Sequence, residues 1–358
     1  MQKYRIIPKN LAYGKEARYN IKNKIGLPLS SEKISFNNFK IQTIHNKNIN
    51  LKTYSISEPE NWKNKYLDHD SINSMLKDIS EKPKSFMNMK NKNFYIIGIL
   101  NMTPDSFSNN KKNIPSLNQA IKKAVKMCEE GADIIDVGGE SSRPGSQPIN
   151  RIEEQRRIIP IINKLSKMNI TVSCDTRNSN TMEKAIDSGA KIINDISSLN
   201  DKNSANIISK NKVGVVLMHM LGNPSNMQTN PIYKNVSIEI INYLEEKKKY
   251  AINHGIKENK ILIDPGIGFG KKDYHNIKIF RNLGMLHCIN SNIMIGASRK
   301  SLIGRLTSTS IEQRLPSSIA LAISAIEKGV KFYRVHEVKE TLQALTMWNK
   351  INHYKKLN

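Results

Sequence analysis

Residues 93–108 read NFYIIGILNMTPDSFS, in which a continuous apolar run, Tyr95–Leu100, ends in a polar signature. An apolar run of this length is typical of a strand that is buried on both faces. The same arrangement recurs seven more times along the chain. The later polar signatures are, in order, Gly138–Gly145, Cys174–Thr176, Asn194–Asp195, Met218–Met220, Asp264–Gly266, Ser298–Ser301 and Arg334–His336.

Segments with helical periodicity separate these apolar runs. In residues 117–130, for example, Ala120, Ala124 and Cys128 fall on one face of a helix. Eight strand–helix units in about 260 residues are the size of a (β/α)8 barrel, in which the carboxyl ends of the strands build one pocket. The predicted strands are Tyr95–Leu100, Asp133–Val137, Ile170–Cys174, Ala190–Asn194, Val213–Met218, Ile261–Asp264, Ile293–Ala297 and Lys331–Arg334.

The structural alternative is a doubly wound open sheet. Such a sheet would need a glycine-rich dinucleotide loop after its first strand, and residues 101–108 contain no glycine. We therefore predict an α/β protein with a (β/α)8 TIM barrel over residues 93–358.

Residues 1–92 differ in composition from the rest of the chain and are predicted to form an N-terminal extension. They are rich in Lys and Asn and contain two short alternating pieces, Phe39–Ile44 and Leu51–Ile56, which could pair as a hairpin. Residues 82–92 have the composition of a linker. Because no catalytic constellation occurs here, we expect a small accessory layer, and a barrel that still folds when residues 1–85 are deleted.

The formal net charge of the 358-residue chain is +25, from 56 Lys and Arg against 31 Asp and Glu. Such an excess is compatible with nucleic acid, an anionic membrane or a phosphorylated substrate as partner. The charge is spread along the whole chain, however, and aromatic residues make up only 6%. These features favour a general bias towards Lys over a nucleic-acid-binding surface, so no nucleic-acid partner is predicted.

The three cysteines, Cys128, Cys174 and Cys288, have no CxxC spacing. Neither a zinc site nor a disulfide framework is therefore indicated. No run of about 18 apolar residues is present to span a membrane, and the first residues lack the apolar stretch of a secretion signal. The sequence predicts a reduced, cytosolic protein without a membrane partner.

Asp175 and Asp264 each end a predicted strand. A carboxylate at that point could simply cap the following helix, or it could accept two parallel N–H donors from a flat heterocycle. Two such carboxylates, together with Asn194 and Lys300 at other strand ends, favour a shared pocket. Two carboxylates, an amide and an ammonium group could bind the hydrogen-bonding edges of a pterin-like ring.

Arg334 and His336 lie two residues apart at the end of the last predicted strand. The period of two points both side chains the same way, so they could clamp a phosphate or diphosphate. A surface salt bridge is the alternative, but phosphate sites recur at this end of (β/α)8 barrels. Asn101 ends the first strand and offers a carbonyl oxygen for Mg²⁺, a hard cation that accompanies diphosphates.

Two polar loops could close over a second substrate. The loop 103–108 holds Asp105 and Phe107, and the loop 140–145 holds Ser142 and Arg143 between glycines. Ordinary turn chemistry is the alternative for both loops. Three other positions have equally open interpretations. Ser301 could cap a helix that receives a carboxylate, the His219–Met220 pair could contact substrate or pack in the core, and Phe269 could contact a flat ring or shape its loop.

Motifs of other enzyme classes are absent. The sequence has no Gx4GK[ST] loop, GxSxG elbow or HExxH helix, and no residue resembles an activated nucleophile. Covalent catalysis is therefore not indicated.

The motif set NMTPDSFS, DVGGESSRPG, CDT, INDI, LMHM, DPGIGFGK, SRKS and RVH resembles that of the dihydropteroate synthase family of folate biosynthesis, the target of sulfonamides. The resemblance extends over residues 94–350. It implies a transferase that joins 6-hydroxymethyl-7,8-dihydropterin diphosphate to 4-aminobenzoate and releases diphosphate, and it implies a homodimer. Two positions depart from the family pattern, Ser142 in place of Thr and Glu337 in place of Asp.

The resemblance also implies roles for individual residues. Asn101 would help to hold Mg²⁺, and Arg334 and His336 would bind diphosphate. Catalysis would depend on Asp105, Arg143, Lys300, Arg334 and His336. Substrate would contact Ser142, Asp175, Asn194, Met220, Asp264, Phe269, Lys300 and Ser301, the last near the carboxylate of 4-aminobenzoate.

The chemistry implied by this family fits a site without a nucleophile. An electron-rich dihydropterin stabilises a methylene cation, so the C–O bond to diphosphate can break early in an SN1-like substitution, while cationic groups stabilise the departing charge. Two rivals remain. A pterin-dependent methyltransferase would share the two aspartates and the asparagine but would expel no diphosphate, and a basic RNA-binding protein would show steeply salt-dependent affinity.

Overall fold

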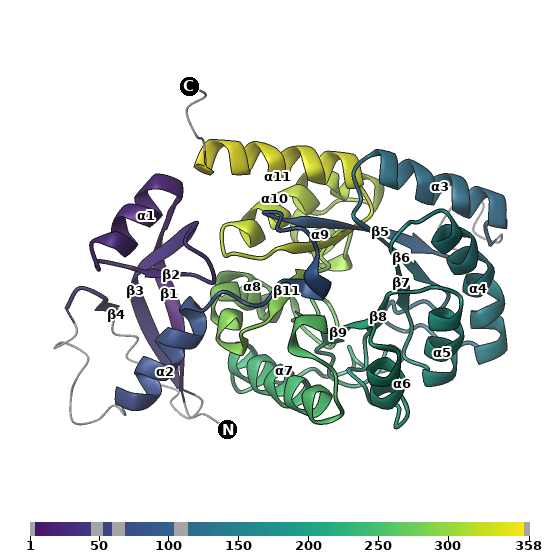
Figure 1. Cartoon of the computed structure of the whole chain (residues 1–358), viewed down its shortest axis with the longest axis horizontal. Coiled ribbons are helices and arrows are strands. Elements are labelled where there is room, and N and C mark those ends of the chain that lie inside the picture. Colours follow the sequence, from purple (N-terminus) through teal and green to yellow (C-terminus); the bar gives the residue numbers. More distant parts are fainter. Residues whose placement is uncertain (1–3, 44–52, 59–68, 104–113, 354–358) are drawn as a thin grey trace.

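The computed structural model describes residues 4–43, 53–58, 69–103 and 114–353, and it contains a closed eight-stranded parallel barrel (Figure 1). Each strand pairs with its neighbours in sequence, and β12 closes the barrel on β5. The (β/α)8 prediction is therefore confirmed. The strands are β5 (Tyr95–Asn101), β6 (Ile134–Gly138), β7 (Val172–Asp175), β8 (Ile192–Asp195), β9 (Gly214–Met218), β10 (Ile261–Asp264), β11 (Asn292–Ile295) and β12 (Phe332–Val335).

Helices cover the outside of the barrel. They are α3 (Leu117–Glu129), α4 (Arg151–Lys167), α5 (Ser179–Asp187), α6 (Ser204–Asn211), α7 (Val236–Asn253), α8 (Asp273–Arg281), α9 (Ser301–Thr307), α10 (Leu315–Ile326) and α11 (Val338–His353). Two of the helical regions are not single continuous α-helices. Residues 277–286 divide between α8 and the 3-10 segment η4 (Leu283–Ile289), and residues 311–328 contain the short η5 (Glu312–Arg314) before α10, which begins with a proline in its first turn.

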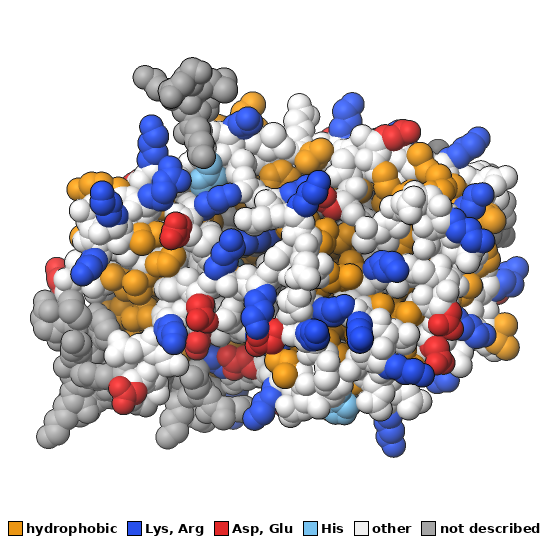
Figure 2. Space-filling view, in the orientation of Figure 1, with side chains coloured by type: hydrophobic (Ala, Val, Ile, Leu, Met, Phe, Trp, Pro, Cys, Tyr) orange, Lys and Arg blue, Asp and Glu red, His pale blue; other side chains and the backbone are white. Residues whose placement is uncertain are grey.

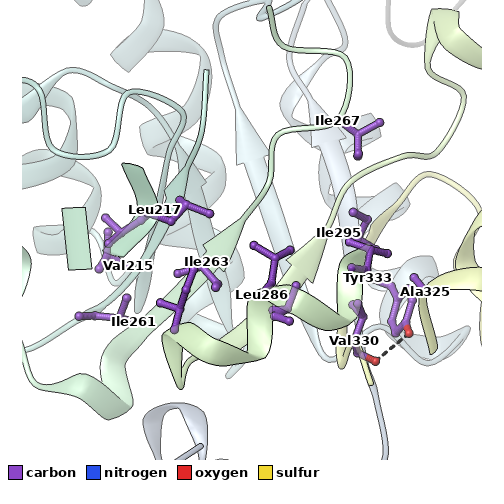
Figure 3. Packing of buried hydrophobic residues seen from close by; sticks show 14 of the residues in the cluster. Val215, Leu217, Ile261, Ile263, Ile267, Leu286, Ile295, Ala325, Val330 and Tyr333 are labelled. Atoms are coloured by element: carbon purple, nitrogen blue, oxygen red, sulfur yellow. Dashed lines mark hydrogen bonds between the residues drawn. The ribbon is translucent and has the colours of Figure 1, made fainter. Parts of the chain in front are cut away.

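The strands are continuous apolar runs because both of their faces are buried. Val215 and Leu217 of β9, like Ile261 and Ile263 of β10, point outwards and pack under the helices (Figure 3). The residues between them point inwards and fill the barrel. This inner layer consists of Tyr95, Ile97, Ile134, Ile192, Val216, Leu262, Met294 and Phe332.

The N-terminal residues form a small layer beside the barrel. It contains β1 (Tyr4–Tyr13), α1 (Gly14–Lys22), β2 (Leu27–Pro28), β3 (Ile34–Thr43), β4 (Thr53–Ser55) and α2 (His69–Ser80). Strand β3 lies between β1 on one side and β2 and β4 on the other, and all of these pairs are antiparallel. The two alternating pieces expected to pair do so, with Phe39 opposite Tyr54, while their predicted turn lies outside the described residues.

This layer shares a core with the barrel. Ile72 and Ile79 of α2 are fully buried in the same cluster as Leu283 and Leu286 of η4. Arg5 of β1 is also buried, forms an ion pair with Glu245 of α7 and donates a hydrogen bond to Asn242 Oδ1 at 2.6 Å. The layer is thus attached to the side of the barrel by apolar packing and by a partly buried ion pair.

The segment between α2 and β5, residues 81–94, closes the amino end of the barrel. Phe86, in the 3-10 turn η2 (Phe86–Asn88), is buried and meets Phe332 edge to face at 5.6 Å. A Cβ at Gly214 would lie within 3 Å of the side chains of Phe86 and Met87. The residues with a linker composition therefore act as a plug, which only a glycine at the start of β9 can accommodate.

Across the described part of the chain, no helix is long and apolar enough to cross a bilayer. The three cysteines are free, as predicted. A cytosolic location stays a prediction from the sequence.

Candidate active site

The polar site lies one inward-facing position beyond the apolar inner layer. Two residues after Ile134, Ile192, Leu262 and Phe332, the period of two places another inward side chain on each strand. Those side chains are Asp136, Asn194, Asp264 and Arg334. The barrel interior is therefore apolar in its lower part and polar at the carboxyl ends of its strands, as expected for the active end of this fold.

Arg334 is the centre of this layer. Its Nε donates to Asp136 Oδ2 and its Nη2 donates to Asp175 Oδ2, both at 2.6 Å. Asp136 Oδ2 also accepts a hydrogen bond from Asn194 Nδ2 at 3.1 Å. One guanidinium thus joins side chains from strands that are far apart in sequence, while its Nη1 has no hydrogen-bond partner among the described residues.

Asp136 is a residue that the sequence interpretation missed. It is 1% exposed and lies inside β6, two residues before the strand end at which the polar signatures begin. The signal that could have found it is an aspartate within a strand predicted to be buried on both faces, since an unpaired buried carboxylate is costly. Asp136 Oδ1 and Asn194 Oδ1 are buried acceptors that receive no hydrogen bond from the residues the structure describes, which suits a ligand that carries N–H groups.

The charges in this layer do not balance. With two carboxylates for one guanidinium, burial and the adjacent Asp136 carboxylate raise the pKa of Asp175, and Arg334 opposes that rise. Burial disfavours the charged form of Arg334, but the Asp136 and Asp175 carboxylates outweigh it and raise the pKa of Arg334, so the guanidinium keeps its charge at any ordinary pH. The site therefore holds an excess of acceptor groups around a fixed cation.

Asp264 and Lys300 lie on the other side of Arg334. Asp264 Oδ1 accepts a hydrogen bond from the Gly266 amide at 2.7 Å, and burial raises the pKa of its carboxyl group. A Cβ at Gly296 would lie 3.9 Å from Asp264 Oδ2 and 3.8 Å from Arg334 Cβ. Gly296 therefore leaves room for a methyl-sized group between these two side chains.

The Lys300 ammonium lies over the ring of Phe269, 4.0 Å from its centre, and donates to the carbonyl oxygen of Ile267. Burial lowers the pKa of Lys300 to about 7, although the Asp264 carboxylate opposes this shift. The predicted association of Asp175, Asn194, Asp264, Lys300 and Arg334 is thus observed, with Phe269 beside Lys300.

His336 stands near Arg334 but is uncharged. Burial and the Arg334 guanidinium lower the pKa of His336 to about 3. Its Nδ1 lies 2.9 Å from Ser298 Oγ, which also contacts Glu337. His336 can therefore offer a hydrogen bond to a phosphate group but no permanent charge. Arg334 supplies the permanent positive charge in this part of the site, and Lys300 adds to it only when protonated.

Asn101 ends β5 at the same end of the barrel. A Cβ at Gly138 would lie 3.3 Å from Asn101 Oδ1 and 3.5 Å from Asp175 Oδ2, which places the two oxygens on either side of Gly138. Within the described residues the Asn101 side chain makes no hydrogen bond, and no group of three or more His, Cys, Asp or Glu suits a metal ion. This donor set fits Mg²⁺, which uses one or two protein oxygens together with substrate phosphates and water.

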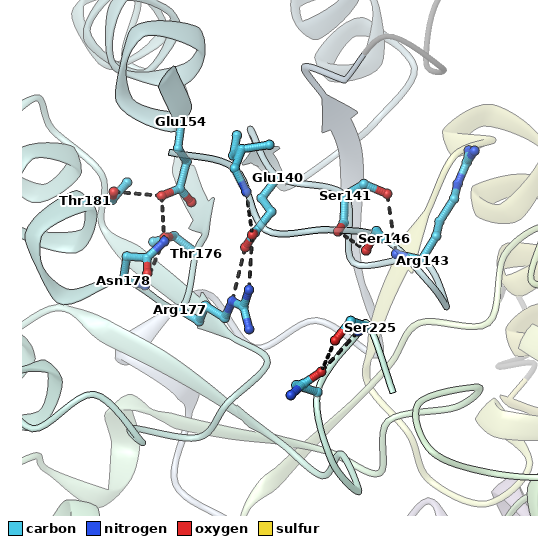
Figure 4. Close-up of polar contacts among 12 residues, drawn as sticks. Glu140, Ser141, Arg143, Ser146, Glu154, Thr176, Arg177, Asn178, Thr181 and Ser225 are labelled. Atoms are coloured by element: carbon cyan, nitrogen blue, oxygen red, sulfur yellow. Dashed lines mark hydrogen bonds and ion pairs between the residues drawn. The ribbon is translucent and has the colours of Figure 1, made fainter. Parts of the chain in front are cut away.

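The loop after β6 borders the site with a network of polar contacts (Figure 4). Arg177 pairs with Glu140 at 3.1 Å through two nitrogens. The Gly145 amide donates to the carbonyl oxygen of Pro224, which joins this loop to the loop after β9. Arg143 is exposed and Ser142 is half-buried, so both remain accessible to a second substrate.

Three loop predictions had other outcomes. Asp105 and Phe107 lie outside the described residues. The prediction that Ser301 caps a helix is wrong, because Lys300 occupies the N-cap position of α9. Ser301 is the exposed first residue of that helix. Met220, two residues beyond the end of β9, is half-buried.

His219 is buried, and Lys271 explains its environment. Lys271 is 1% exposed, and its Nζ contacts His219 Nδ1 at 2.9 Å and donates to the carbonyl oxygen of Phe269, also at 2.9 Å. Burial holds the pKa of both groups well below their usual values. The sequence left His219 open between core and substrate contact, and it missed Lys271, which connects the loops after β9 and β10.

This layer therefore combines hydrogen-bond acceptors for a flat nitrogen heterocycle with a cationic corner for an anion. The family model described as pterin binding enzyme matches residues 97–336, the part of the chain that contains the barrel strands and this layer. Fold, site and family model define a pterin-binding enzyme.

Comparison with known proteins identifies the family within this class of enzymes. Dihydropteroate synthase of Neisseria meningitidis serogroup C is 40% identical over 257 residues, 71% of this chain and 91% of that protein. Dihydropteroate synthase of Escherichia coli K12 is 40% identical over 252 residues, 70% and 89% of the two chains. The crystal structure of the Yersinia pestis dihydropteroate synthase with a sulfonamide drug superimposes with a TM-score of 0.69 at 37% identity, covering 73% of this chain and 94% of that one. The chain belongs to the dihydropteroate synthase family.

Proposed function

We propose that this protein condenses (7,8-dihydropterin-6-yl)methyl diphosphate with 4-aminobenzoate to give 7,8-dihydropteroate and diphosphate, a step of tetrahydrofolate synthesis. The observation that carries the proposal is the buried polar layer around Arg334, whose unsatisfied acceptors match a pterin ring. The Xanthomonas albilineans dihydropteroate synthase structures with 4-aminobenzoic acid and with 7,8-dihydropteroate support it, at 36% and 34% identity, TM-scores of 0.68 and 0.66, and 73% of this chain and 94% of theirs covered in each case.

In this mechanism the chain's own groups bind and orient the substrates. Asp175, Asn194 and Asp264 accept hydrogen bonds from the ring nitrogens and the amino group of the pterin, and Lys300 donates to an acceptor on the ring. Asp136 positions Asn194 and Arg334 through its Oδ2, and its Oδ1 is left to accept a hydrogen bond from the ring. Lys300 lies at the N-cap of α9 and the other side chains lie on barrel strands, which keeps the site rigid before the substrate binds.

The bond change is a substitution at the methylene carbon of the pterin. The C–O bond to diphosphate breaks and its electron pair leaves with the diphosphate, which the free Nη1 of Arg334 and a hydrogen bond from His336 stabilise. The amine of 4-aminobenzoate then forms the C–N bond and releases one proton to water. Mg²⁺ held by Asn101 and the diphosphate oxygens would neutralise further leaving-group charge. Arg143 and Ser142, with Asp105, would serve the 4-aminobenzoate side.

Diphosphate release tests the proposal. On mixing both substrates with Mg²⁺, the protein should release one diphosphate for each dihydropteroate formed, and omission of 4-aminobenzoate should stop product formation. A pterin-dependent methyltransferase would release none, so an absence of diphosphate under these conditions would reject the assignment.

An Asp264→Asn variant should bind the pterin diphosphate about 10- to 100-fold more weakly, because an amide replaces one of two acceptor oxygens by a donor. The asparagine oxygen can still accept from the Gly266 amide, so the fold should change little. Isothermal calorimetry measures the affinity. Asp273→Asn is the matched control, since Asp273 pairs with Arg305 at the surface of α8 and should bind as the parent does.

Lys300 should make binding pH-dependent. Its pKa of about 7 in the free protein is below the ordinary value of 10.5, so at pH 8 most molecules carry a neutral Lys300. If the anionic substrate raises this pKa, binding takes up a proton, and affinity should fall by up to about tenfold per pH unit above pH 7. Calorimetry at pH 8 in two buffers of different ionisation enthalpy should show proton uptake in the parent and none in Lys300→Met. Equal uptake in both proteins would remove Lys300 as the source.

Homodimerisation is part of the proposal. Helix α10 is strongly apolar, yet Leu315, Ile319 and Ile323, one turn apart, are only partly buried. A second copy of the chain could cover this stripe. Light scattering should give twice the mass of one chain, and Ile319→Glu should shift the protein to monomer. If the unmutated protein is a monomer, the proposed homodimer is rejected.

A further inference from the structure

The amino end of the barrel, opposite to the polar layer, contains a cavity of about 350 Å³. It lies where the connector, defined here as residues 81–94, passes below the starts of β5, β11 and β12. Figure 1 shows this connector in dark blue, running from the N-terminal layer towards the barrel. The connector precedes the segment that the family model matches, so the cavity is built partly by residues outside the family's common part.

The walls of the cavity carry positive charge only. Four lysines line it, Lys82, Lys84, Lys92 and Lys331, and no Asp or Glu is among the lining residues. Lys84 pairs with Glu258 at 3.0 Å and Lys92 pairs with Asp133, both outside the lining. Neither Lys82 nor Lys331 has an acidic partner within the described residues. Lys and Arg are also spread over this face of the molecule in Figure 2.

Lys331 is unusual among these lysines because it is half-buried at the start of β12. Burial, together with the charges of Lys82 and Lys33, lowers the pKa of Lys331 to about 8. A bound anion near Lys82 and Lys331 would relieve the repulsion between the two ammonium groups. Part of the wall is apolar, since the rings of Tyr95 and Phe332 stack there with their centres 4.5 Å apart.

We propose that this cavity binds a small organic phosphate, with the phosphate held between Lys82 and Lys331 and the organic part against Pro83 and the Tyr95–Phe332 wall. The volume is within the range of small-molecule sites. A ligand here would join the connector to the barrel and would lie at the far end of the barrel from the active site. The site is thus distinct from the one that binds the diphosphate substrate.

Pyridoxal 5′-phosphate is a suitable probe because it combines a phosphate, a flat ring and an aldehyde. The Nζ amine of neutral Lys331 adds to the aldehyde carbon and water leaves, which forms an imine. Borohydride then transfers a hydride to the imine carbon and fixes the label. Digestion and mass spectrometry locate each modified lysine, and Lys300, which also has a lowered pKa, falls in a different peptide because Arg305 lies between them.

In the full-length protein, pyridoxal 5′-phosphate should label Lys331 about tenfold faster than pyridoxal, which lacks the phosphate. Lys82→Met should reduce this preference, and inorganic phosphate should slow the labelling more than sodium chloride of equal ionic strength. Lys210→Met, an exposed lysine on α6, is the matched control and should change nothing. Equal labelling of Lys331 by the two aldehydes, or a phosphate preference that survives Lys82→Met, would overturn the proposal.

Discussion

An Arg334→Met variant is expected to lose about 3–5 kcal/mol of its free energy of unfolding, together with all measurable synthase activity. Arg334 is the partner of two buried carboxylates, Asp136 and Asp175, each 2.6 Å from a guanidinium nitrogen. Without the guanidinium, two carboxylates face each other with no cation, and removal of one partner of a buried ion pair is far more costly than its net contribution. The same variant would lose activity because it lacks the guanidinium that stabilises the departing diphosphate.

Chemical denaturation at pH 7 measures the loss of stability, and the diphosphate assay measures activity. The electrostatic cause can be separated from a packing defect by a second change. Asp136→Asn in the Arg334→Met background removes one of the repelling charges and should restore a large part of the lost stability while leaving activity absent. The deficit should also shrink as the pH falls, because protonated carboxyl groups do not repel. If Asp136→Asn lowers stability further and acid has no effect, repulsion is not the cause.

Deletion of residues 1–80 is expected to leave a barrel that does not fold. The sequence favoured the opposite result, because the first 92 residues contain no catalytic motif. In the structure, five large aliphatic side chains of this segment are no more than 1% exposed, and burial of each contributes about 1.5–3 kcal/mol. Their sum is comparable with the whole stability of a typical domain, about 5–15 kcal/mol. The five residues are Ile6, Leu29, Ile72, Met75 and Ile79.

The yield of soluble protein and the far-ultraviolet circular dichroism of the truncated chain test this expectation. Arg5→Met with Glu245→Gln is an informative control, because it removes the ion pair to α7 and keeps the apolar contacts. This double variant should fold, since replacement of both partners leaves no unpaired buried charge. A truncated protein that unfolds cooperatively and retains activity would show that the barrel is independent of the N-terminal layer.

The fold could be predicted from the sequence because strands buried on both faces leave a strong pattern. Each apolar run ends in its polar signature within two residues of the observed strand end, as with Asp264 at the end of β10. The site residues at strand ends followed from the same pattern. The role of Asp136 could not be predicted from this pattern, because its partners Arg334 and Asn194 come from other strands and only the closed barrel brings them together.

Other features were missed for similar physical reasons. Lys271 has the sequence appearance of a surface lysine, and its burial depends on the carbonyl oxygens and the His219 ring that the loops place around it. The connector has a linker composition, yet Phe86 fits the open end of the barrel. Ser301 was assigned a cap from its residue type, although the helix begins one residue earlier than a cap at that position requires.

The plug formed by Phe86 has a consequence for the order in which the chain can fold. Phe86 is buried against Phe332, and Arg5 pairs with Glu245, so the first part of the chain to be synthesised depends on partners that are made much later. Strand β12, the last of the barrel, also pairs with β5, the first. The apolar side chains through which the N-terminal layer and connector contact the barrel therefore remain exposed until these later partners have been made, and contacts of such long sequence separation are slow to form.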